Sequence, residues 1–249
     1  MEECFAIINQ KGGVGKSTTS NAMGAGLQKQ GQRVLYVDLD AQGNLSYSLN
    51  STGRPLTSLE VLTGTAKAEE AVVTTPQGDL IPASPSLASA DALLTETGKE
   101  YRLKEAIAPL LDSYNYIIID TPPALGVLTI NALTAATSVI IPAQADIYSL
   151  QGIGQLYQTI FAVQKYCNKD LKIKGILITR YSSRTILTQD MLQLLQNTAE
   201  QLNTKVYESK IRECISIKEA QAKKQDIFSY APKSNAATDY YKFINQVMI

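Results

Sequence analysis

A glycine-rich turn followed by a lysine and a hydroxyl stands near the start of the chain. It reads Gln10-Lys11-Gly12-Gly13-Val14-Gly15-Lys16-Ser17-Thr18 and follows the apolar run 5–8. Its glycines let backbone N–H groups converge on phosphate oxygens, and a helix that begins here directs its positive end at the same anion. In such loops the lysine reaches the β and γ phosphates and the hydroxyl holds Mg²⁺. We therefore expect residues 12–18 to bind a nucleoside triphosphate, with Lys16 on its phosphates and Ser17 on the metal. A glycine-rich turn without a ligand is the plainer alternative.

Three acidic residues follow apolar runs that are typical of strands. Asp38 and Asp40 come after the run 33–37, and Asp120 follows the β-branched run 116–119. Ligands of open α/β sheets bind outside the carboxyl ends of the strands, so we expect these carboxylates beside the loop, where they can orient water and Mg²⁺. Alternate residues of an extended segment point the same way, which puts Asp38 and Asp40 on one side. A solvated acidic turn and an ordinary strand end are the alternatives.

The elements that position these residues alternate along the chain. Strands are predicted over 5–9, 33–37, 116–119, 138–142 and 171–179, and the continuous apolar run within 33–37 is typical of a parallel strand that is buried on both faces. Helices are expected over 17–30, 126–136, 147–166 and 188–201, with shorter helices at 56–62, 86–94 and 99–111 and possible strands at 72–74 and 79–81. The fold class is α/β: a single P-loop NTPase domain over residues 1–249, with a mostly parallel twisted sheet and helices on both faces.

Composition limits the remaining possibilities. The 249 residues include 23 basic and 23 acidic side chains, so no global field favours nucleic acid or anionic lipid. Residues 1–159 carry 9 Lys/Arg against 15 Asp/Glu, giving −6, whereas residues 160–249 carry 14 against 8, giving +6. Any surface for a polyanion therefore belongs to the last third. Three scattered cysteines and no histidine argue against metal clusters and disulfides, and a cytoplasmic protein is the simplest expectation.

The loop departs from the usual phosphate-binding pattern, because Gln10 replaces its first glycine and a second lysine, Lys11, follows. In this it resembles the deviant Walker A loop of the ParA/MinD class of ATPases. Asp38 and Asp40, the segment Asp120-Thr121-Pro122-Pro123 and the tail 229–234 are also similar to that class, and in particular to small ParA/Soj-type partition ATPases. Two departures are Ala41, where the family usually has proline, and Asn21, which the family commonly has one position later.

The resemblance implies ATP and Mg²⁺ as ligands and a homodimer in which Lys11 of each subunit reaches the phosphates bound by the other. Asp40 then positions the attacking water, and Asp38 supports the metal with Ser17 and Asp120. The family's partners are non-specific DNA and a ParB-like adaptor that triggers hydrolysis. Expected adenine neighbours are Thr179, Arg180, Ile211 and Arg212, and expected DNA contacts are Arg184, Arg212 and Lys218.

Other functions remain open at this point. A MinD-like membrane ATPase needs a basic amphipathic C-terminal helix, but residues 239–249 contain one lysine, Lys242, so membrane binding is not expected. An iron–sulfur carrier needs matched cysteines, and a tyrosine kinase of the class usually has a tyrosine-rich tail. A nucleotide-sensing scaffold with little hydrolysis is a further alternative, which the presence of Lys11 and Asp40 disfavours.

Overall fold

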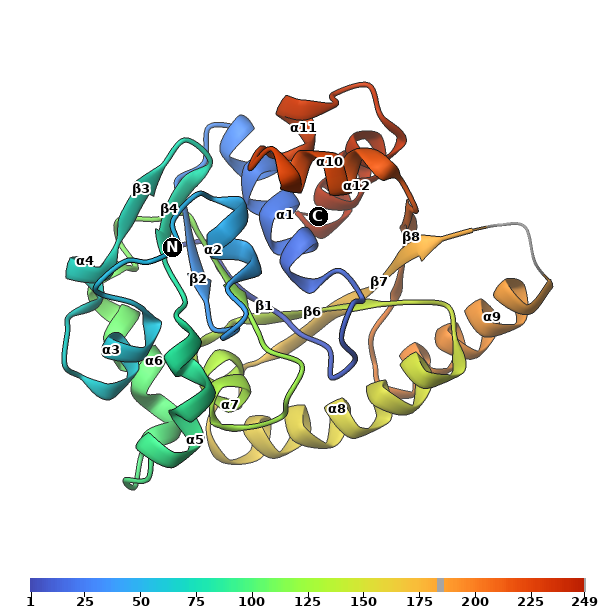
Figure 1. Ribbon diagram of the computed structural model, residues 1–249. Helices are drawn as coiled ribbons and strands as arrows, with labels where there is room; N and C mark the ends of the chain where they lie inside the picture. Colours follow the sequence, from blue (N-terminus) through green and yellow to red (C-terminus); the bar gives the residue numbers. More distant parts are fainter. Residues whose placement is uncertain (183–185, 249) are drawn as a thin grey trace.

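The computed structural model describes residues 1–182 and 186–248, and the side chains of residues 186–188 are not among those described. In this part of the chain, one eight-stranded sheet runs through the molecule in the order β3-β4-β2-β5-β1-β6-β7-β8 (Figure 1). The strands are β1 Glu3–Ile7, β2 Val34–Asp38, β3 Val73–Thr75, β4 Gly78–Ile81, β5 Tyr116–Asp120, β6 Ser138–Ala143, β7 Lys172–Tyr181 and β8 Val206–Arg212. Every neighbouring pair is parallel except β3 and β4. The predicted α/β fold with a mostly parallel sheet is confirmed.

Helices cover both faces of this sheet (Figure 1). One face carries α1 Lys16–Lys29, α2 Asn44–Ser48, α10 Ile215–Ala222, α11 Ile227–Tyr230 and α12 Asn235–Val247. The other carries α3 Ser58–Thr63, α4 Ala68–Ala71, α5 Ala90–Leu93, α6 Arg102–Ile107, α7 Val127–Ala135, α8 Ile147–Tyr166 and α9 Ile186–Gln201. Strands β2, β5 and β6 are buried along their whole length, which is why their sequences are continuous apolar runs.

The carboxyl ends of the central strands gather the predicted chemistry. β1 leads into the glycine-rich loop, and β2 and β5 pair in parallel with Asp38 directly opposite Asp120. After β1 the chain first forms β2, β3 and β4 on one side of it, and after β5 it crosses to form β6, β7 and β8 on the other side. Such a reversal of strand order opens a crevice at the carboxyl edge, where ligands of this architecture bind.

Several elements differ from the expected ones. The short helices α2, α4, α10 and α11 were not expected, and neither was β8, whose residues Glu208, Ser209 and Lys210 interrupt the apolar pattern of an edge strand. The expected helix at 99–111 consists of α6 between two 3₁₀ turns, Lys99–Tyr101 and Ala108–Leu110, the second of which contains Pro109. Among the described residues, no helix combines the length and apolar character needed to cross a membrane.

Candidate active site

The glycine-rich loop has the backbone that a phosphate cradle needs. Gly13 has φ +76° and Gly15 has φ +87°, a conformation that side chains other than glycine rarely adopt. Gly15 is also the N-cap of α1, so the first N–H groups of that helix face the same space. A Cβ added at Gly12 or Gly13 would meet no protein atom within 4 Å. The loop therefore encloses open space beside a helix N-terminus.

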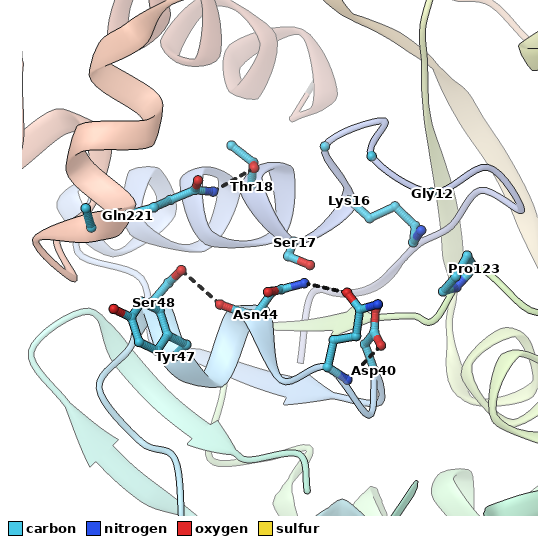
Figure 2. Close-up of a pocket in the computed structure, with 14 residues that line it drawn as sticks. Gly12, Lys16, Ser17, Thr18, Asp40, Asn44, Tyr47, Ser48, Pro123 and Gln221 are labelled. Atoms are coloured by element: carbon cyan, nitrogen blue, oxygen red, sulfur yellow. Dashed lines mark hydrogen bonds between the residues drawn. The ribbon is translucent and has the colours of Figure 1, made fainter. Parts of the chain in front are cut away.

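That space is a cavity of about 530 Å³ over the start of α1 (Figure 2). The loop and helix side contributes Lys16, Ser17 and Thr18, and the opposite wall carries Asp40. Further lining comes from residues outside the predicted site: Gln42, Asn44, Tyr47, Ser48, Pro123, Gln221 and Ala222. Figure 2 shows Gln221 of α10 reaching the loop helix, where its Nε2 donates to Thr18 Oγ1 at 2.9 Å. The structure thus brings the predicted phosphate residues and Asp40 together around one cavity.

Lys16 lies at the bottom of this cavity and is largely buried. Burial lowers the pKa of its ammonium, while the nearby carboxylates of Asp120 and Asp40 oppose this shift. A buried cation whose charge is supported by two acids is suited to a polyanion such as a triphosphate, which adds further negative charge beside it.

Asp120 has an unused acceptor. Its side chain is fully buried, and Oδ1 accepts a hydrogen bond from Ser20 Oγ at 3.0 Å, whereas Oδ2 has no hydrogen-bond partner in the described chain. Burial raises the pKa of Asp120, and the neighbouring charge of Asp38 raises it further. A buried carboxylate oxygen without a partner is costly unless a cation or a metal-bound water occupies its lone pairs. Asp120 and Ser17 therefore fit a magnesium site.

Both carboxylate oxygens of Asp38 accept hydrogen bonds from the chain. Its Oδ1 accepts from the Asp40 N–H at 3.1 Å, and its Oδ2 accepts from the N–H and the hydroxyl of Ser46 at 2.8 and 2.7 Å. Burial raises the pKa of Asp38, and these hydrogen bonds partly offset that shift. Both oxygens are engaged by the chain, so in this arrangement Asp38 holds α2 and the Asp40 backbone in place. Its role on the metal stays a prediction.

Lys11 points away from the cavity of its own chain. Its Nζ lies 2.5 Å from Asp146 Oδ2 and 3.1 Å from Gln144 Oε1, in the loop between β6 and α8. Asp146 is also the N-cap of α8, because its Oδ1 accepts from the Ser149 N–H at 2.9 Å. Burial alone would raise the pKa of Asp146, but the hydrogen bonds from Lys11 and Ser149 lower it below its usual value. The pair joins residues 135 positions apart, so sequence reasoning did not find it.

The four residues predicted to flank adenine line a second cavity. Thr179, Arg180, Ile211 and Arg212 surround a space of about 160 Å³ on the other side of the loop. This cavity shares Gly13, Gly15, Thr18 and Gln221 with the first one. Thr179 Oγ1 donates to the carbonyl of Val14 at 2.7 Å, which ties the end of β7 to the loop. Cys214, Ile217 and Tyr240 also line this cavity and were missed; the apolar residues around 211–217 were the available signal for the first two.

The predicted DNA contacts have three different outcomes. Arg184 lies outside the described residues. Arg212 is held by Asp239, with Nε at 2.9 Å from Oδ2 and Nη2 at 2.6 Å from Oδ1, so a carboxylate already neutralises its charge. Lys218 is exposed and lies with Arg212 at the second cavity. The structure therefore places Arg212 and Lys218 beside the expected base site, and their role in binding DNA stays a prediction.

Comparison with known proteins agrees with this site. Residues 2–173 match a family model described as an AAA domain. The chain is 40% identical over 252 residues to the sporulation initiation inhibitor protein Soj of Bacillus subtilis, covering 99% of this chain and 98% of that protein. It is 37% identical over 251 residues to the chromosome-partitioning ATPase Soj of Treponema pallidum, covering 100% of this chain and 98% of the relative.

Solved structures have the same architecture. A Mycobacterium smegmatis protein described as cobyrinic acid a,c-diamide synthase, with bound ADP and magnesium, is 40% identical with a TM-score of 0.85, covering 98% of this chain and 93% of that one. Cyanothece McdA, at 23% identity and a TM-score of 0.89, covers 99% of both chains and shows the shared fold alone. The loop, the acidic residues and the full-length similarity to partition proteins together lead to one conclusion: the chain belongs to the Soj/ParA family of ATPases.

Proposed function

We propose that the protein is a Mg²⁺-dependent ATP switch for DNA partitioning, which dimerises around ATP, binds DNA non-specifically as a dimer and separates after hydrolysis. The observation that carries this proposal is the placement of the two lysines. Lys16 lies inside the cavity, whereas Lys11 is held outside it by Asp146.

ATP and Mg²⁺ are the ligands that fit the two connected cavities. The larger cavity supplies backbone N–H groups, Lys16 and Ser17 for a triphosphate, and the smaller one supplies apolar side chains such as Ile211 and Ile217 for a base. Mg²⁺, when bound, neutralises negative charge on the phosphate oxygens during transfer. The unpartnered Oδ2 of Asp120 is the acceptor of this chain that such a metal site would use.

Asp40 is the group proposed to orient the attacking water. It lines the cavity, and its Oδ1 accepts the Gln42 N–H at 3.0 Å, which fixes the direction of the carboxylate. The backbone of Asp40 is in turn held by Asp38. Positioning of this kind reduces the entropy that the reaction must lose, so a small shift of α2 is expected to change the rate.

Lys11 is proposed to act on the phosphates held by a second copy. In this structure its ammonium is on Asp146, and Lys11 does not line the cavity formed by the rest of the loop. A second subunit face to face would present a triphosphate, whose charge competes with the single carboxylate of Asp146. A cation added to the transferring phosphoryl group at that moment stabilises the transition state. Release of phosphate removes this attraction and lets the subunits separate.

DNA binding is proposed for the face that carries α10–α12. The last third of the chain has an excess of six positive charges, and exposed lysines on this face include Lys218, Lys223, Lys233 and Lys242. Lysines that neutralise phosphates release counterions, which gives affinity without sequence preference. A dimer presents two such faces, so DNA affinity rises through bivalency when ATP joins the subunits. A ParB-like adaptor is the proposed trigger of hydrolysis.

The test is fluorescence anisotropy of a labelled duplex with ATP, with ADP and without nucleotide. Asp40→Ala, which blocks hydrolysis, is expected to bind DNA with ATP only, and Lys11→Ala is expected to bind weakly in all three conditions. Lys223→Glu is expected to weaken binding and to reduce the slope of log affinity against log salt, whereas Lys169→Glu, an exposed lysine after α8 on the other face, changes neither. DNA affinity that does not depend on the nucleotide would contradict the proposal.

The mycobacterial relative raises amide synthesis as a second function, since its description names a diamide synthase. Release of ammonia from glutamine commonly needs a thiol activated by a base, and the chain contains no histidine to form a Cys–His pair. Cys4, moreover, is fully buried, and burial raises the pKa of its thiol to about 12. The partition function is therefore preferred.

A further inference from the structure

The first turn of α8 carries two large apolar side chains on the molecular surface. Ile147 is 51% exposed and Tyr148 is 69% exposed. The helix itself is unusually poor in charge for one at the surface, because Lys165 is the single charged residue among its 20. About a quarter of the residues in soluble proteins are charged, so roughly five would be expected. Depletion of charge together with exposed aromatic and aliphatic residues is typical of the core of a protein interface.

The position of this turn indicates which partner covers it. Ile147 directly follows Asp146, and Asp146 Oδ2 is 2.5 Å from Lys11 Nζ. The proposed function requires Lys11 to reach phosphates bound by a second copy. Its ammonium can extend no further from the backbone than the length of a lysine side chain. The second copy must therefore come close to Asp146 and to the turn that begins there.

We infer that Ile147 and Tyr148 are an apolar contact in the ATP-bound dimer, and that the second copy of this chain is their partner. This inference rests on the proposed function. In a dimer with two-fold symmetry the same turn enters the interface twice, so its contribution to the free energy of dimerisation is doubled. An uncharged surface also suits a protein partner rather than DNA, whose proposed binding face lies on the opposite side of the sheet with α10–α12 (Figure 1).

The same helix supplies a matched control. Tyr166 is 70% exposed, nearly the same as Tyr148, but it lies at the other end of α8. The two tyrosines are 18 positions apart, which corresponds to about 27 Å along a helix. Neither tyrosine lines the two cavities around the loop. A change at Tyr148 that acted only through exposure or helix stability would be reproduced at Tyr166.

The experiment compares Tyr148→Gln and Tyr166→Gln in an Asp40→Ala background, with saturating ATP, by sedimentation velocity over a range of protein concentrations. Tyr148→Gln is expected to raise the dimer Kd at least about tenfold, equivalent to about 1.4 kcal/mol. Tyr166→Gln is expected to change it less than about twofold. Binding of a fluorescent ATP analogue to dilute monomers should be the same for all three proteins, and circular dichroism melting checks that each variant is folded.

Each other outcome overturns a stated claim. If the Asp40→Ala parent dimerises with ATP and Tyr148→Gln dimerises equally well, the inference is wrong while the proposed function stands. If both tyrosine variants weaken the dimer equally, a specific contact at the first turn is excluded. If the parent stays monomeric with ATP, the proposed function fails and this inference fails with it.

Discussion

The ion pair between Lys11 and Asp146 predicts that one neutral substitution tightens the dimer. Lys11 must leave Asp146 before it can reach another subunit, so this pair stabilises the monomer. Asp146→Asn removes the charge that holds Lys11. Asparagine is as good an N-cap as aspartate, so the hydrogen bond with the Ser149 N–H that begins α8 can be kept.

The expected magnitude follows from the exposure of the pair. The side chains of Lys11 and Asp146 are 27% and 33% exposed, and the Nζ–Oδ2 distance is 2.5 Å. Partly exposed ion pairs of this kind contribute about 0.2–1 kcal/mol each. Two pairs are lost when a dimer forms, so their removal is worth about 0.4–2 kcal/mol, or about a twofold to thirtyfold lower dimer Kd.

The assay is sedimentation equilibrium of Asp40→Ala with ATP, with and without Asp146→Asn. Asp226→Asn is the matched control, because Asp226 caps α11 through the Ser229 N–H at 2.9 Å and has no contact with Lys11. It should leave the dimer Kd unchanged. A dimer that is weakened by Asp146→Asn, or is equally affected by both substitutions, would refute the claim that this ion pair holds Lys11 back.

Three further predictions concern the scaffold around the site. Gly24→Ala should destabilise the protein by about 1–3 kcal/mol in urea unfolding, because the added Cβ would lie 2.3 Å from the Tyr36 ring, whereas Gly154→Ala has open space and should be neutral or stabilising. Ser46→Ala should lower the free energy of unfolding by about 1–3 kcal/mol, because Asp38 loses a buried hydroxyl donor. It should also lower the hydrolysis rate, because Asp38 and α2 then hold Asp40 less firmly; an unchanged turnover rate would contradict this link between Ser46 and Asp40. In the ligand-free protein, burial raises the pKa of Asp120 above its unfolded value, so the folded state binds the extra proton and stability should fall as pH rises from about 4 through the folded pKa. Chemical denaturation at several pH values measures how the free energy of unfolding changes with pH, and Asp120→Asn should make this change smaller. A free energy of unfolding that rises over this pH range would contradict the raised pKa of Asp120.

The phosphate side of the site was predictable because its signals are local. Gly13 and Gly15 have the positive φ angles that only glycine readily adopts, and Lys16 follows them on the first turn of α1. Asp120 ends β5 and Asp40 lies two residues after the end of β2, and the apolar runs of both strands are continuous in the sequence. A parallel sheet then places their carboxyl ends together without further information.

The remaining parts depend on contacts between distant residues. Helix α2 has five residues of modest helix propensity, and it is held by the hydrogen bonds between Asp38 and Ser46 rather than by its own sequence. The partners of Lys11 and Arg212 were missed for the same reason, since they lie 135 and 27 positions away. The pairing of Arg212 with Asp239 also shows why a positive residue in the sequence does not by itself indicate a free positive charge on the surface.

The central claim is that ATP joins two copies of the chain and that Lys11 of each contributes to the site of the other. Light scattering of Asp40→Ala with ATP tests it most directly, with Asp40→Ala/Lys11→Ala beside it. The account predicts twice the chain mass for the first protein with ATP, and the mass of one chain with ADP or when Lys11 is absent. A single-chain mass for Asp40→Ala with saturating ATP, or a dimer that forms equally well without Lys11, would contradict it.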